Sequence, residues 1–181
     1  MRNCSYPLSS VLLCILIILN GCHAEALNEK EHSDIKWEKL GPGGGGAVFI
    51  PTFSYKSAAN FLLRCDMTGT YLTHNEGSSY QQINLAGGAS SYAWDPSDSN
   101  IVYIGSAFLN RSQDGGTNWE RIFPPKEEIT VEQFIGDHAD YSIKTTEVSL
   151  YDNESGRIGA IRADPLKPGF VYFSMGRYFY Y

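Results

Sequence analysis

The sequence repeats a short motif in which an aromatic residue is followed, three positions later, by an aliphatic residue. The motif begins at Trp37, Tyr80 and Trp119, so successive copies are 43 and 39 residues apart. Short β-rich runs lie between the copies, separated by turn residues such as Gly, Asn, Asp, Ser and Pro. A period of about 40 residues is typical of one four-stranded blade of a β-propeller.

A second repeat pairs an Asp-Pro turn with an apolar strand. Asp95-Pro96 precedes Val102 by seven residues, and Asp164-Pro165 precedes Val171 by the same interval. Proline favours a turn here because it fixes φ and has no N–H for a sheet. The two copies are 69 residues apart, which is too long for one blade. We therefore predict an insertion, or an elaborated surface loop, near residues 124–157.

These repeats predict an all-β fold, a partial β-propeller over residues 37–181 with about three blades of four-stranded antiparallel sheet. Closed propellers usually contain about four to eight blades. An open propeller would also leave unpaired sheet edges. The chain is therefore expected to be an N-terminal fragment of a larger propeller.

The first residues have the pattern of an export signal. Arg2 precedes an apolar run of nine residues, Val11 to Leu19, which is too short to span a bilayer. Leu19 to Cys22 resembles a bacterial lipobox, which implies a signal peptide at residues 1–22, a lipid on Cys22 and a polar tether at 23–36. Ordinary cleavage after Ala24 is the alternative. The protein is thus expected to be exported, either as a membrane-anchored lipoprotein at the cell surface or periplasm, or in secreted form.

Charge and cysteine content exclude several classes of function. The net charge of −6 supplies no field for phosphate, so no nucleic acid partner is expected. Cys65 is the one cysteine beyond the predicted signal, which leaves no disulfide framework and no cysteine metal site. Asp137, His138 and Asp140 could chelate a cation, but we interpret them as a solvated loop. No metal and no cofactor are expected.

One eight-residue segment has a pattern with a known structural role. Residues 112–119, Ser-Gln-Asp-Gly-Gly-Thr-Asn-Trp, match the Asp-box or BNR repeat, Ser-x-Asp-x-Gly-x-x-Trp, at every defined position. A weaker copy lies 39 residues earlier, at 73–80. Asp114 is expected to accept backbone N–H bonds in a hairpin turn, with Gly116 allowing the turn and Trp119 packing into the blade. We interpret Ser112, Asp114, Gly116 and Trp119 as structural.

The predicted propeller begins with a glycine-rich segment, Trp37 to Gly46, followed by the stretch Arg64 to Tyr71. These two segments resemble the start of glycoside hydrolase family 74, and sortilin-type propellers more distantly. The resemblance covers about residues 37–124 and, weakly, 158–174. That family cleaves xyloglucan with two seven-bladed propellers. The resemblance implies that Asp66 is the general base of an inverting hydrolase whose acid lies in a second propeller. Thr68 stands where the family has glycine.

Asp66 keeps a second interpretation, as a turn aspartate that accepts backbone N–H bonds. The Gly43 to Gly46 run lacks the Lys-Ser/Thr of a phosphate loop, so we expect it to pass close to the propeller axis or a bound sugar. Tyr71 and Tyr92 are candidates for stacking on sugar rings. Two functions therefore remain open. One is a carbohydrate-active propeller related to hydrolases of β-glucan or xyloglucan-type polysaccharide. The other is a non-catalytic surface propeller that binds glycan or protein.

Overall fold

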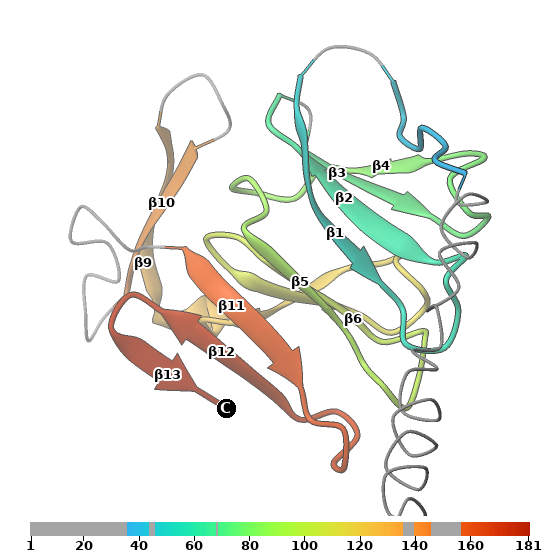
Figure 1. Ribbon diagram of the computed structural model, residues 1–181. Coiled ribbons are helices and arrows are strands. Elements are labelled where there is room, and N and C mark those ends of the chain that lie inside the picture. The colour runs from blue at the N-terminus through green and yellow to red at the C-terminus, as the bar shows by residue number, and fades with distance from the viewer. Residues whose placement is uncertain (1–35, 44–45, 68, 136–139, 146–156) are drawn as a thin grey trace, which may run out of the picture. The chain divides into compact units, whose positions relative to one another are not determined.

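The computed structural model describes residues 36–43, 46–67, 69–135, 140–145 and 157–181 (Figure 1). Several features of the sequence analysis lie outside these residues: the predicted signal peptide, the lipid site at Cys22, Thr68, Asp137 and His138. Almost all of the predicted tether lies outside them as well. The chain divides into two units, Met1–Lys39 and Leu40–Tyr181, and the second contains every strand. Across the described residues, no helix is long and apolar enough to cross a membrane.

Three antiparallel meanders make up most of the second unit. Blade 1 contains β1 (Val48–Phe53), β2 (Phe61–Cys65), β3 (Gly69–Thr73) and β4 (Gln81–Ile83) in that order. Blade 2 contains β5 (Ser91–Trp94), β6 (Val102–Gly105), β7 (Leu109–Ser112) and β8 (Glu120–Phe123). Blade 3 contains β11 (Ile158–Ala163), β12 (Val171–Met175) and β13 (Tyr178–Tyr180). The all-β prediction with about three blades is confirmed, although blade 3 has three described strands where four were expected.

A separate hairpin lies between blades 2 and 3, within the range where the insertion was predicted. A short 3-10 helix, Lys126–Glu128, leads into β9 (Ile129–Ile135), which pairs with β10 (Asp140–Thr145). An ion pair between Arg121 on β8 and Glu132 on β9 ties the hairpin to blade 2. The Arg121 guanidinium also lies over the Phe108 ring, 3.6 Å from its centroid.

The first strands of the three blades lie next to one another. In Figure 1, β5 runs between β1 and β11, and it contacts both of them. The second strand of blade 2, β6, also contacts β11, while the remaining strands follow in order within each meander. Such an order, with one strand per blade on the inside, is the arrangement that defines a propeller.

Blade 2 is buried on both faces, and its sequence shows why. Alternate residues of a strand point to opposite faces of the sheet. One set of blade 2 side chains packs against Leu62, Leu72 and Ile83 of blade 1; this set is Ala89, Tyr92, Trp94, Val102 and Ile104. The other set packs against Ile158, Ile161 and Phe173 of blade 3; it is Ala93, Tyr103 and Leu109. The apolar run at 101–104 is therefore continuous because both of its faces are covered.

The turn after the first strand is the same in all three blades. Asp95 donates its backbone N–H to Ile101 at 3.0 Å, and Asp164 donates to Phe170 at 2.9 Å. Ser54 donates to Asn60 at 2.9 Å in the matching turn of blade 1. The Asp-Pro repeat in the sequence showed two of these turns. The third was missed because Ser54 replaces the aspartate and no proline follows it.

Candidate functional site

Asp66 follows β2 directly and is held by an extension of the β1–β2 ladder. Val48 pairs with Cys65 in this ladder, and the next residues, Ala47 and Asp66, continue the pairing. The Asp66 N–H donates to the Ala47 carbonyl at 3.3 Å. In return, the Ala47 N–H donates to Asp66 Oδ1 at 2.8 Å. The last glycine of the glycine-rich run makes this approach possible. Gly46 has a φ of +93°, and a Cβ there would lie 2.5 Å from Asp66 Oδ1.

The two carboxylate oxygens of Asp66 have different surroundings. Oδ1 accepts the Ala47 N–H and also receives the Cys65 thiol at 3.7 Å. For Oδ2, the described residues supply no hydrogen bond, and the side chain as a whole is exposed. The turn interpretation therefore accounts for one oxygen. The other remains accessible to a ligand or a water molecule.

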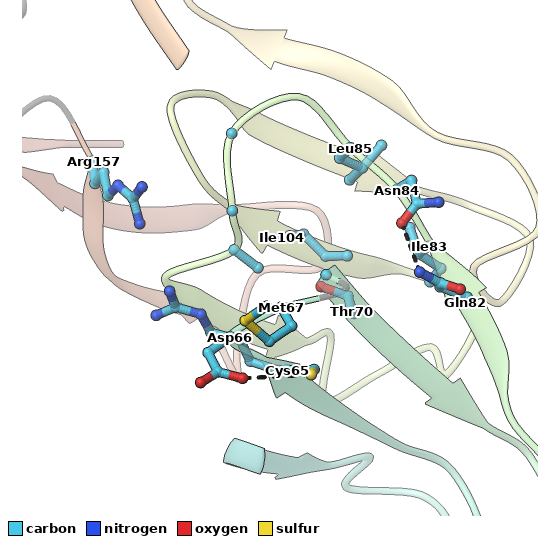
Figure 2. Close-up of a pocket in the computed structure, with 15 residues that line it drawn as sticks. Cys65, Asp66, Met67, Thr70, Gln82, Ile83, Asn84, Leu85, Ile104 and Arg157 are labelled. Carbon is cyan, nitrogen blue, oxygen red and sulfur yellow. Dashed lines mark hydrogen bonds between the residues drawn. The ribbon is translucent and has the colours of Figure 1, made fainter. Parts of the chain in front are cut away.

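A pocket of about 400 Å³ opens beside Asp66, at the ends of the strands (Figure 2). One side is formed by the end of β2 and the start of β3, residues 64–67 and 69–70, and another by residues between Gln82 and Ala89. Ile104 of β6 and Arg157, just before β11, complete the lining. All three blades therefore contribute residues to a single pocket.

Amide groups and apolar groups share this lining. Gln82 Nε2 donates to Asn84 Oδ1 at 3.1 Å, and both side chains face the pocket in Figure 2. Met67 and Leu85 add apolar surface nearby. Few, oriented polar groups among apolar ones are typical of sites for small organic ligands. The combination suits a ligand with both hydroxyl groups and nonpolar ring faces, such as a sugar.

Two guanidinium groups give the pocket a positive balance of charge. Arg64 and Arg157 line it together with Asp66, which is the one carboxylate among the described lining residues. Arg64 also acts on Tyr92. Burial raises the pKa of the Tyr92 hydroxyl to about 12, against the opposing effects of its hydrogen bond with Thr70 and of the Arg64 charge.

The structure places neither Tyr71 nor Tyr92 in the lining of this pocket. Tyr92 is only 4% exposed, and its hydroxyl forms a 2.8 Å hydrogen bond with Thr70 inside the blade 1–blade 2 core. Tyr71 lies edge-on to Tyr80, with ring centroids 6.3 Å apart. Strand alternation explains the position of Tyr71, because this residue and its pocket-lining neighbour Thr70 point to opposite faces. For Tyr71, stacking on a sugar stays a prediction.

The residues of the predicted Asp-box lie at the other end of blade 2. Ser112 pairs with Val102, whereas the pocket end of the same sheet pairs Gly105 with Leu109. Ser112 Oγ accepts N–H bonds from Asp114 at 3.3 Å and Gly116 at 2.8 Å. Asp114 Oδ1 accepts the Asn118 N–H at 2.8 Å, and the Trp119 indole N–H donates to the Gly116 carbonyl at 2.9 Å. These four residues are thus engaged with their own turn.

The weaker copy in blade 1 forms the same network with different side chains. Thr73 Oγ1 accepts N–H bonds from Asn75 at 3.2 Å and Gly77 at 3.0 Å. Asn75 Oδ1 accepts the Ser79 N–H at 2.9 Å, as Asp114 does for Asn118. Each turn also donates one backbone N–H to the first turn of its own blade, from Glu76 to Ala59 and from Gly115 to Asn100.

Several pocket residues were missed by sequence reasoning. Arg64 belongs to the motif that singled out Asp66, but no role was predicted for it. Gly87 and Gly88 are adjacent glycines, which indicate a close approach of the backbone, and no role was predicted for them either. Gln82, Asn84 and Arg157 had no local signal, because the pocket joins segments that are far apart in the chain. Among the described side chains, no group of three or more His, Cys, Asp or Glu residues could hold a metal ion.

The chain was compared with known proteins and solved structures. No protein-family model and no curated protein matches it. A crystal structure of the GH74 enzyme from Niastella koreensis matches 72% of the chain at 16% identity, with a TM-score of 0.48. An ancestral GH74 enzyme matches 76% at 19% identity, with a TM-score of 0.44. The chain spans only 19% and 23% of those two structures.

Proposed function

We propose that this chain is an exported, carbohydrate-active propeller that binds β-glucan or xyloglucan-type polysaccharide in the Asp66 pocket. The observation that carries the proposal is the pocket itself. It presents a carboxylate, an amide pair and apolar side chains at one end of the blades. The export signal and the lipid anchor on Cys22 would hold this pocket outside the cytoplasm, where polysaccharide is encountered.

Asp66 is proposed as the general base of glycoside hydrolysis. Its Oδ2 oxygen is accessible and can accept a proton from water, while Oδ1 is fixed by the Ala47 N–H at 2.8 Å. An inverting hydrolase places its two carboxyl groups about 6.5–9.5 Å apart, so that a water molecule fits beside the sugar. Because Asp66 is the one carboxylate among the described lining residues, the acid has to come from elsewhere.

Binding without hydrolysis is the second candidate, and a specific contact favours it. The Ala47 N–H donates to Asp66 Oδ1 at 2.8 Å, so this oxygen already has a partner within the protein. The same contact is what a turn aspartate requires. In this case the propeller would hold glycan at the surface, with Asp66 as a hydrogen-bond acceptor for sugar hydroxyls.

The two candidates separate in one experiment with the full-length protein and Asp66→Asn. Binding is measured by retardation in gels containing neutral or carboxylated β-glucan, and hydrolysis by release of reducing ends. If Asp66 is the base, the variant keeps its retardation and loses at least about 100-fold in hydrolysis. Retardation without release of reducing ends by the unaltered protein favours the binding candidate.

Asp98→Asn is the matched control, because Asp98 is an exposed aspartate in a turn at the far end of blade 2. It should change neither readout. A protein that is not retarded by any of the β-glucans contradicts the proposed function as a whole. Hydrolysis that survives Asp66→Asn contradicts the role given to Asp66.

A further inference from the structure

The positive charge in the pocket is unexpected in this chain. The protein carries a net charge of −6, yet the described residues that line its pocket include two arginines and one aspartate. Neutral sugars need no guanidinium group, since amides and hydroxyls satisfy their hydrogen bonds. A local positive field in an acidic protein points to a ligand of opposite charge.

The two guanidinium groups converge on one place, beside Gly88. A Cβ atom on Gly88 would lie 3.9 Å from Nη1 of Arg157 and 4.0 Å from Nη2 of Arg64. The groups come from different blades, since Arg64 is on β2 and Arg157 precedes β11. Figure 2 shows Arg157 on the opposite side of the pocket from Gln82 and Asn84.

Arg64 has unused capacity to donate hydrogen bonds. Its Nε is buried and has no hydrogen-bond partner among the described residues, and it forms no ion pair with any of them. A buried donor without a partner is costly to a folded protein. Nε itself is out of a ligand's reach, so an oxyanion in the pocket would be bound by the terminal nitrogens, of which Nη2 lies near Gly88.

We infer that the pocket binds an acidic carbohydrate, whose carboxylate lies between Arg64 and Arg157 next to Gly88. A carboxylate in that position would be within reach of both guanidinium groups. The hydroxyl groups of the sugar face Gln82 and Asn84, and its ring lies against Met67. The inference rests on the proposed function, since it names the class of β-glucan that the same pocket takes, one with uronic acid units.

Isothermal titration of the full-length protein with a matched set of oligosaccharides tests this. The set is cellotetraose, the same tetramer with its C6 positions oxidised to carboxylates, the methyl ester of that acid, and the C6-sulfated tetramer. The acid is expected to bind at least about tenfold more tightly than the other three at low salt, and to lose that advantage at high salt. Equal or tighter binding of cellotetraose or the ester overturns the inference, and tighter binding of the sulfated tetramer overturns the carboxylate assignment.

Three variants test which arginines bind the carboxylate of the ligand. Arg157→Gln and Arg64→Gln should each weaken binding of the acid about tenfold and leave the methyl ester unchanged. Arg111→Gln is the control, since Arg111 pairs with Glu120 away from the pocket, and it should leave both ligands unchanged. If both arginine variants bind the acid as well as the unaltered protein does, the inference is wrong.

Gly88→Ala provides a second test that does not depend on removing a buried arginine. The added methyl group meets its neighbours at ordinary contact distances, so the fold should survive, which circular dichroism checks. It occupies the space between the two guanidinium groups and should reduce the preference for the acid over the ester. An unchanged preference contradicts the proposed position of the carboxylate. Absence of binding by every tetramer contradicts the proposed function rather than this inference alone.

Discussion

Gly115 and Gly116 are neighbours in one turn, yet only Gly116 lies too close to blade 1 to carry a side chain. Both have positive φ, at +71° and +98°. A Cβ on Gly116 would lie 2.3 Å from Leu72 Cδ2, and Leu72 belongs to blade 1 and is 1% exposed. A Cβ on Gly115 would lie 3.7 Å from its nearest neighbour, His74. Gly116 is therefore required for blade packing as well as for the turn.

Gly116→Ala is expected to destabilise the protein more than Gly115→Ala does. Both substitutions force alanine into a conformation that costs about 1 kcal/mol or more. The change at Gly116 also displaces Leu72, and overpacking of a core adds about 1–3 kcal/mol. Urea denaturation of the two variants measures the difference. Equal losses of stability would show that Leu72 moves aside freely and that only the turn matters.

At the scale of the element, the outer turns of blades 1 and 2 show one backbone geometry built with different chemistry. Asp114 in blade 2 is ionisable, whereas Asn75 in the matching position of blade 1 is not. Hydrogen bonds from the backbone of Asn118, from its side chain and from Ser112 lower the pKa of Asp114 to about 2. The two turns therefore share one backbone geometry, but only the stability of the blade 2 turn is expected to depend on pH.

The sign of that sensitivity follows from the direction of the pKa shift. A carboxyl group whose pKa is lower in the folded state adds stability above its unfolded pKa, here 3.8, and loses it as pH falls through about 2. Asp114→Asn should therefore be less stable than the unaltered protein near pH 7. Its disadvantage should shrink between about pH 4 and pH 2.

The measurement is the difference in urea midpoint between the two proteins across this pH range. The difference is needed because the pKa values of Asp95, Asp164 and Glu120 are also lowered, and these groups titrate in both proteins. Asn75→Ala removes the matching acceptor from blade 1 without removing a charge, so its disadvantage should not vary with pH. A disadvantage of Asp114→Asn that is constant from pH 7 to pH 2 would contradict the role of ionisation.

At the scale of the whole molecule, the blades are joined by contacts that no blade makes alone. Ser90 Oγ donates to the Ile158 carbonyl at 2.6 Å, and the Gly169 N–H donates to Asp95 Oδ2 at 3.2 Å, both between blades 2 and 3. The Trp94 indole N–H donates to the Thr52 carbonyl at 3.1 Å, between blades 2 and 1. Blade 2 contributes to both interfaces, so we expect the three blades to unfold together.

Ile161→Ala tests this cooperativity, because Ile161 is fully buried between blades 2 and 3. The loss of a buried isoleucine side chain costs about 2–5 kcal/mol, whereas Ile161→Val costs about 0.5–1.5 kcal/mol and serves as the graded control. Trp94 and Trp119 both pack at the blade 1–blade 2 interface and report its unfolding by fluorescence in a Trp37→Phe background. The urea midpoint of this fluorescence should fall together with that of the circular dichroism signal. An unchanged fluorescence midpoint would mean that blade 3 unfolds independently.

The sequence by itself was enough to predict the all-β class and the number of blades. Each blade is a local unit of about 40 residues. Its strands and turns therefore recur in the sequence at that interval, and the repeat is visible without knowing how the blades pack. The turn chemistry of Ser112 to Trp119 was equally readable, since the side-chain hydrogen bonds of Ser112, Asp114 and Trp119 lie within these eight residues. The turn at Ser54 was not, because the backbone bonds that define it do not depend on an aspartate or a proline.

The pocket was decided by the tertiary structure. Asp66 could be singled out from its motif, but its contact with Ala47 and the pocket that it shares with Arg157 depend on chain segments that pair or pack only after folding. Tyr92, a candidate for stacking on sugar rings, is buried for the same reason, since the packing of blade 1 against blade 2 covers that ring. Local spacing determines strands and turns, whereas the packing of one blade against the next determines which side chains converge and which remain accessible.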